Sequence, residues 1–92
     1  MTVIKTKIVK DSDNYRSNYD HHKRLSDDLN DRLSKIREMG PSKRVEKHRS
    51  RGKLTARERI DRLKDNNTKI LELSEFAGYE VYDDNIPAAG II

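Results

Sequence analysis

His48-Arg-Ser-Arg-Gly-Lys-Leu-Thr-Ala-Arg-Glu-Arg-Ile60 is the stretch that decides the local fold, because it holds a helix end, a turn and a helix start. Gly52 suits the left-handed backbone that commonly ends a helix. Thr55 and Glu58 have the spacing of a capping box, in which the Thr55 hydroxyl accepts the Glu58 N–H and the Glu58 carboxylate accepts the Thr55 N–H. The stretch therefore predicts one helix that ends near Gly52 and another that begins after Thr55.

A short basic helix is expected before this turn and a third helix after it. Pro41 suits the first turn of the earlier helix, residues 42–51, since its missing N–H has no intrahelical partner there. Ile60 and Leu63 are the apolar residues of the later helix, and we expect them to form its buried face.

The sequence after the third helix favours extended chain. Asp65-Asn66-Asn67 tolerates turn and left-handed backbone, and Lys69 to Leu73 predicts a short strand with Leu71 and Leu73 on one face. The last stretch, Ile86-Pro-Ala-Ala-Gly-Ile-Ile92, ends on two β-branched apolar residues. We expect it to be cut at the start of a further strand, since the last residues of a domain are usually exposed and poorly ordered.

A long amphipathic helix is predicted over residues 14–39, after a polar tail over residues 1–13, and Gly40-Pro41 is expected to end it. Its larger side chains recur every three or four residues on one stripe: Tyr15, Tyr19, His22, Leu25, Leu29, Leu33, Ile36 and Met39. At a rise of about 1.5 Å per residue the helix is close to 40 Å long, more than so small a chain covers. We expect it to lie along a partner or another domain.

The composition argues against a small independent domain. Hydrophobic residues make up 33% of the 92 residues and charged residues 39%, whereas globular domains are about 45–50% apolar and about 25% charged. Burial of so little apolar surface hardly offsets the lost backbone entropy. The chain is therefore expected to be a piece of something larger.

Several protein classes are excluded by what the sequence lacks. The absence of Cys excludes disulfide scaffolds, thiolate zinc sites and Cys nucleophiles. No apolar run approaches the roughly 20 residues that span a bilayer, and residues 1–13 resemble neither a signal peptide nor a transit peptide. The expected location is the cytoplasm.

Charge is strongly segregated along the chain. Residues 1–40 have a net charge of +2, residues 41–64 of +7 and residues 65–92 of −5. The basic block has three open interpretations: a solvated helix face, a site for phosphates or a cofactor, and a nucleic-acid surface without aromatic residues to stack bases. The densest run of cations in the block lies over residues 43–53 and consists of Lys43, Arg44, Lys47, Arg49, Arg51 and Lys53.

No catalytic or metal-binding residue is predicted. The sequence has no Gly-rich phosphate loop, no His-Glu-x-x-His and no nucleophile elbow. His21 and His22 are adjacent, so on a helix they point about 100° apart and do not converge on one metal ion. His48 is interpreted as a solvated helix residue.

Residues 48–60, taken with Leu71-Glu-Leu-Ser-Glu-Phe-Ala-Gly-Tyr-Glu-Val-Tyr82 and residues 86–92, resemble the start of the carboxyltransferase (beta) subunit of biotin-dependent acyl-CoA carboxylases. Within that family Phe76-Ala-Gly-Tyr79 is most similar to the methylcrotonoyl-CoA carboxylase branch, as are Asn18-Tyr19 and the long polar helix. The similarity covers nearly the whole chain.

The resemblance implies an α+β fragment with the N-terminal helices and first strands of a crotonase-like (ClpP/crotonase) carboxyltransferase domain. Residues 40–92 would be the incomplete start of that domain. The implied chemistry, in leucine catabolism, is transfer of a carboxyl group from carboxybiotin to the γ-carbon of 3-methylcrotonoyl-CoA through an enolate. The groups that hold the enolate lie downstream in the family, so this chain alone is expected to be inactive.

The resemblance also implies cofactors and partners. Biotin would sit on a separate alpha subunit, where ATP and bicarbonate are consumed, and the full-length subunit would form a homo-oligomer, with no membrane and no nucleic acid involved. In a eukaryote the compartment would be the mitochondrion. Coenzyme A carries a diphosphate and a ribose phosphate, and Arg49, Arg51 and Lys53 beside Gly52 are the candidates to contact them; pairing with acidic residues of the same fold is the alternative.

A second function from another class stays open at this point. The chain would then be a small basic helical adaptor that binds nucleic acid or a protein through residues 41–64. Steep loss of binding with added salt is expected of a nucleic-acid adaptor and not of a carboxylase segment.

Overall fold

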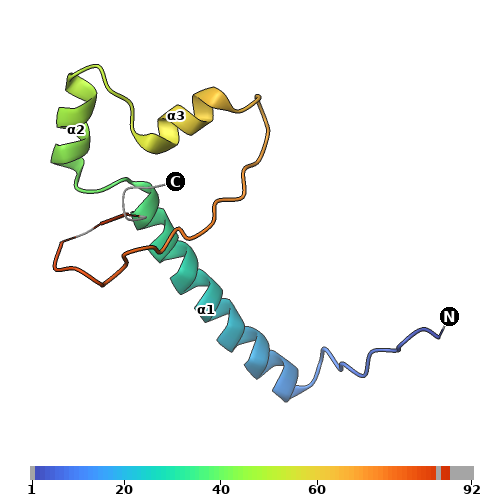
Figure 1. Ribbon diagram of the computed structural model, residues 1–92. Coiled ribbons are helices and arrows are strands. Elements are labelled where there is room, and N and C mark those ends of the chain that lie inside the picture. The colour runs from blue at the N-terminus through green and yellow to red at the C-terminus, as the bar shows by residue number, and fades with distance from the viewer. Residues whose placement is uncertain (1, 85, 88–92) are drawn as a thin grey trace. The chain divides into compact units, whose positions relative to one another are not determined.

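The computed structural model describes residues 2–84 and 86–87 of the chain. They divide into two compact units, Met1–Asn30 and Asp31–Ile92. The described residues form three helices, α1 (Asp13–Arg37), α2 (Ser42–Ser50) and α3 (Ala56–Leu63) (Figure 1). Helix α1 runs across the boundary between the units, whereas α2 and α3 both belong to the second unit.

Helix α1 begins and ends through local backbone chemistry. The Ser12 hydroxyl accepts the Tyr15 N–H at 3.2 Å, which satisfies one of the unpaired donors of the first turn. At the other end Met39 and Gly40 both have positive φ, 64° and 113°. The helix therefore ends at Arg37, two residues earlier than the predicted Met39, because left-handed backbone cannot continue a right-handed helix.

The turn between α2 and α3 forms as its sequence predicts. Gly52 has a φ of 75°, and its N–H donates to the Arg49 carbonyl at 2.9 Å to close the end of α2. The capping box of α3 is confirmed, since the Thr55 N–H donates to Glu58 Oε2 at 2.7 Å and the Glu58 N–H donates to Thr55 Oγ1 at 3.3 Å. Pro41 is the residue before α2 and not part of its first turn.

The core of the described residues is very small. Ile36 of α1 and Val45 of α2 are the buried hydrophobic residues, together with the capping residue Thr55. In α3 the predicted buried face is wrong at Leu63, whose side chain is 86% exposed, while Ile60 is half-buried. The reason is that α3 is joined to the following segment by an ion pair of Arg57 and not by its leucine.

The predicted strand at Lys69–Leu73 is also wrong, because no strand occurs among residues 2–84 and 86–87. Asn67 adopts the expected left-handed backbone, with a φ of 62°. The chain then runs on without a regular element, and Leu71 and Leu73 are 85% and 78% exposed. A strand needs a neighbouring strand to pair its N–H and C=O groups, and the described part of the chain offers none. Most of the second predicted strand, residues 88–92, lies outside the described residues.

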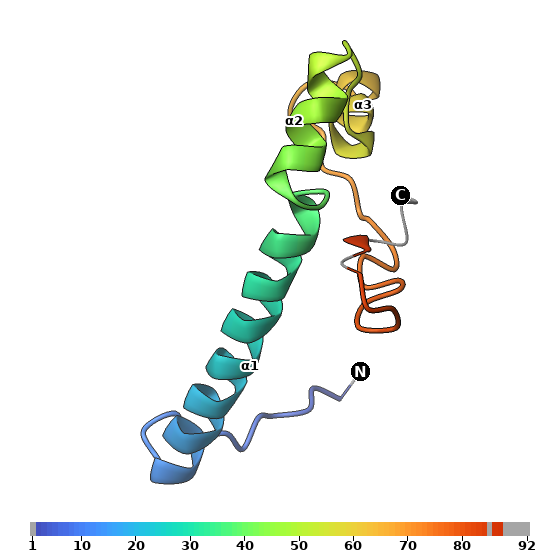
Figure 2. The same ribbon diagram turned by 90° about the vertical axis from the view of Figure 1, so that its left-hand side faces the viewer.

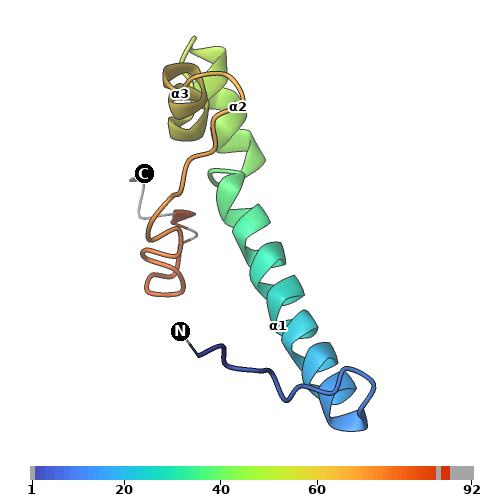
Figure 3. The ribbon, with the colours of Figure 1, turned by 90° about the vertical axis from the view of Figure 1, so that its right-hand side faces the viewer.

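Within the second unit the later chain returns toward the earlier helices. Figures 2 and 3, which view the ribbon from opposite sides, both show α2 beside α3 and the segment after α3 running back along the end of α1. The contact of Arg32 with Tyr79 joins the returning segment to α1, and the contact of Phe76 with Tyr79 lies within the segment itself. Arg32 donates to the Tyr79 hydroxyl at 3.1 Å with its guanidinium over the Tyr79 ring, and Phe76 packs edge-on against Tyr79.

Replacement of Thr55 by Ala is expected to remove the side-chain half of the capping box and to destabilise α3 by about 1 kcal/mol. Hydrogen exchange at the Glu58 amide should become faster and the helix signal in circular dichroism should fall. Thr68→Ala, which changes the same residue type outside the helices, is the matched control. Unchanged exchange at Glu58 would contradict the role given to the Thr55 hydroxyl.

Candidate functional site

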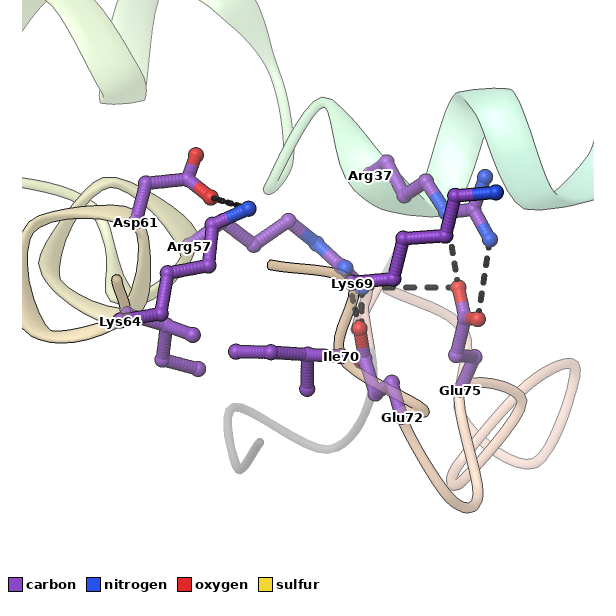
Figure 4. Close-up of a pocket in the computed structure, with 9 residues that line it drawn as sticks. Arg37, Arg57, Asp61, Lys64, Lys69, Ile70, Glu72 and Glu75 are labelled. Atoms are coloured by element: carbon purple, nitrogen blue, oxygen red, sulfur yellow. Dashed lines mark hydrogen bonds and ion pairs between the residues drawn. The ribbon is translucent and has the colours of Figure 1, made fainter. Parts of the chain in front are cut away.

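A cluster of two arginines and two glutamates joins three elements of the second unit (Figure 4). Arg37 at the end of α1 donates through two nitrogens to Glu75, both at 3.0 Å. Arg57 in the first turn of α3 makes a two-pronged pair with Glu72 and also approaches Glu75 at 3.8 Å. The side chains of Arg57 and Glu72 are only 19% and 12% exposed, so the paired charges are largely removed from water.

These four residues form part of the wall of an open hollow of about 480 Å³. Ile60 and Ile70 add apolar surface to it, and Lys64 donates to the Thr68 carbonyl at 3.0 Å nearby. The guanidiniums of Arg37 and Arg57 in the wall are already paired with carboxylates of the same chain, so their charge is neutralised locally. We therefore assign the hollow a structural role.

The pKa values of Arg37 and Glu75 follow from the contact between them. Hydrogen bonds from Arg37 lower the pKa of the Glu75 carboxyl below its usual range, and the same contact raises the pKa of Arg37. The charged forms are thus the stable ones at neutral pH.

The connection between α2 and α3 is held by two further side-chain contacts. His48 donates from Nε2 to the Leu54 carbonyl at 2.9 Å, so it is a structural hydrogen-bond donor and not merely a solvated residue. Arg49 donates to Glu58 Oε1 at 2.9 Å from Nε and contacts the same oxygen at 2.7 Å from Nη2. The Thr55 N–H and then Arg49 lower the pKa of the Glu58 carboxyl.

The three predicted phosphate contacts therefore lie in two different environments. Arg49 is paired with Glu58, as the alternative interpretation of the sequence expected. Arg51 and Lys53 flank Gly52 and are exposed, and the structure gives their side chains no partner within the described part of the chain. The other basic side chains of α2 are exposed as well: Lys43, Arg44 and Lys47.

The sequence analysis missed the cluster of Arg37, Arg57, Glu72 and Glu75. A signal was present at Glu72, because it alternates with Leu71 and Leu73 and so must face away from both in extended chain. Its partner 15 residues earlier could not be identified from local pattern.

The structure adds two negative findings. Within residues 2–84 and 86–87 no group of three or more His, Cys, Asp or Glu side chains is placed to hold a metal ion. Among the same residues no helix has both the length and the apolar character needed to cross a membrane.

Comparison with known proteins relates the chain to one group of enzymes. It is 38% identical over 85 residues to the mitochondrial methylcrotonoyl-CoA carboxylase beta chain of Arabidopsis thaliana, and 39% identical over 88 residues to the probable mitochondrial methylcrotonoyl-CoA carboxylase beta chain of Drosophila melanogaster. A biotin-dependent 3-methylcrotonyl-coenzyme A carboxylase beta1 subunit of Mycobacterium tuberculosis is 44% identical over 73 residues. The chain belongs to the carboxylase beta-chain family.

The matched regions cover 92%, 96% and 79% of this chain but only 14–15% of each beta chain. The chain therefore spans about one seventh of the length of these relatives. No family model matches it, and no solved structure does.

The lowered pKa of Glu75 predicts how its ion pair responds to acid. A carboxyl whose folded pKa lies below its unfolded value of about 4.3 contributes stability in full above that pH and loses it as the pH falls through the folded pKa. A carbon NMR titration should give Glu75 a midpoint below the usual carboxyl range, and Arg37→Met should return it toward that range. The control Arg24→Met should change nothing; an equal midpoint in both variants would contradict the pairing.

Proposed function

We propose that this chain is the N-terminal segment of a methylcrotonoyl-CoA carboxylase beta subunit, which transfers a carboxyl group from carboxybiotin to 3-methylcrotonoyl-CoA. The observation that supports the proposal is the sequence identity of 38–44% with beta chains of this enzyme over 79–96% of the chain. The adaptor hypothesis is not favoured, because the same relatives account for the basic block together with the rest of the sequence.

The proposal assigns the chemical step to the remainder of the subunit. The described residues contain ion pairs and helix caps, and their titratable side chains are either exposed or paired with one another. The enolate would be held by preorganised backbone N–H groups of the downstream crotonase-like domain, which stabilise developing negative charge. Biotin would reach this site on the alpha subunit, and the complete beta subunit would assemble as a homo-oligomer.

This segment would contribute to binding the coenzyme. Arg51 and Lys53 are exposed cations on either side of Gly52, and the phosphates of coenzyme A are the anions they would contact. The arrangement provides charge for recognition and no group for catalysis. The compartment would be the mitochondrion in a eukaryote, as the names of the plant and insect relatives state for those proteins, and the cytoplasm in a bacterium.

The test is a carboxylation assay on the full-length subunit that carries this chain, assembled with a biotin-carrying alpha subunit. With ATP and labelled bicarbonate, label should enter 3-methylcrotonoyl-CoA faster than acetyl-CoA, and avidin should block it because avidin sequesters biotin. Incorporation that avidin does not affect, or none with any acyl-CoA, would refute the proposed function.

A further inference from the structure

The basic residues of α2, and Arg51 directly after it, differ in whether they have a carboxylate partner. Val45 is buried, and Arg49 lies four residues later, so the two share a face of the helix. Lys47 and Arg51 are also four residues apart, and this second pair lies about 200° around the helix from the first. On the first face Val45 is buried while Arg49 stays about half exposed, and the second face carries Lys47 and Arg51 to solvent.

The partner of Arg49 follows from its place on the same face as Val45, although its side chain is 54% exposed. From the Val45 face its guanidinium reaches Glu58 in the first turn of α3, where Glu58 already accepts the Thr55 N–H. The Glu58 carboxylate thus accepts hydrogen bonds both from the backbone N–H of Thr55, the N-cap residue of α3, and from the guanidinium of Arg49 on α2. Arg49 directs Nε and Nη2 at Glu58, so its charge is already paired within the chain, whereas Lys47, Arg51 and Lys53 have no carboxylate partner among the described residues.

The segment between the helices is fixed at both ends. The Arg49–Glu58 pair joins α2 to α3, and the His48 ring binds the Leu54 carbonyl just after the turn. Only residues 51–53 lie between these contacts, so much of the entropy of ordering the turn is already lost before any ligand binds. Such preorganisation lowers the cost of binding.

We propose that Lys47, Arg51 and Lys53 together bind the phosphate groups of the coenzyme, and that Arg49 is a positioning residue which acts through Glu58. This rests on the proposed function for the identity of the ligand, and it corrects the set of residues expected from the sequence. Lys47, in the last turn of α2, and Arg51, the first residue after α2, are four residues apart on one exposed face, and Lys53 follows from the turn.

The experiment is isothermal titration calorimetry on the full-length subunit that carries this chain, with coenzyme A, pantetheine and pyrophosphate as probes. Lys47→Met, Arg51→Met and Lys53→Met should each weaken coenzyme A binding by about three- to tenfold. Pantetheine has no phosphate, so its affinity should not change among the variants. Arg24→Met, which removes one positive charge from α1, is the control for general electrostatics, and circular dichroism checks that each variant keeps its helices.

A double-mutant cycle separates positioning from direct contact. If Arg49 acts through Glu58, Arg49→Met weakens coenzyme A binding in the native background but has no further effect in the Glu58→Gln background. Gln at this position can still accept the Thr55 N–H, so the cap is retained. An equal or larger effect of Arg49→Met in the Glu58→Gln background would show that Arg49 contacts the anion and would overturn the assignment.

The probes also separate this inference from the proposed function. Binding of pyrophosphate but not of coenzyme A, with the same dependence on Lys47, Arg51 and Lys53, would support the anion site and refute the carboxylase ligand. Binding of coenzyme A that none of the three substitutions weakens would overturn the site and leave the function standing. Binding of neither probe would overturn both, as would tighter binding of a single-stranded oligonucleotide than of coenzyme A.

Discussion

The pairing of Arg57 with Glu72 and Glu75 is the interaction on which the second unit depends. Ile36 and Val45 are the buried hydrophobic side chains of the described residues. So small an apolar core cannot by itself hold the long segment after α3 in place. The ion pairs hold this segment against α3 and the end of α1, as apolar packing would do in a larger core. They join the first turn of α3 and the end of α1 to the chain after Leu71.

Partly buried ion pairs of this kind contribute to specificity more than to net stability. Removing charges from water is costly, and the mutual attraction of the partners often only offsets that cost. Breaking such a pair is more harmful, because it leaves an uncompensated charge. Arg57 also keeps a buried Nε with no partner among the described residues. The cluster therefore fixes which segments meet, while most of the chain's apolar side chains stay uncovered.

Those uncovered side chains are consistent with a segment whose packing surfaces lie elsewhere in a longer protein. Leu63, Leu71 and Leu73 are among the most exposed hydrophobic residues, and Leu25 and Leu29 on the α1 stripe are exposed as well. Exposed apolar groups at regular spacing are typical of surfaces that pack against a partner. The beta chains that the sequence matches are about seven times as long as this chain.

The features that the sequence predicted correctly are those decided within a few residues. The capping box of Thr55 and Glu58 and the left-handed backbone of Gly52 and Asn67 need no distant partner. The errors concern long-range packing. The burial of Leu63 and the strand after Asn67 both require a second element, and local pattern does not say whether one is present. The division into a tail, a helix and the start of a larger domain at residues 13 and 39 stays a prediction.

The candidate site shows the same difference between features that the local sequence determines and features that depend on long-range packing. Clustering of cations in residues 41–64 was visible from composition, but the separation of Arg49 from Arg51 and Lys53 depends on where α3 lies relative to α2. Once Val45 is known to be buried, the four-residue spacing places Arg49 on the same face, from which its half-exposed side chain reaches Glu58. The functional interpretation of the basic block therefore depends on which of its cations are paired with carboxylates of the same chain.

The most direct test of the account is the intact mass of the endogenous protein in a cell extract, detected with an antibody against residues 13–37. The account predicts a mass several times 10.8 kDa, because this chain would be the opening segment of a complete beta subunit. A product of 10.8 kDa would contradict it.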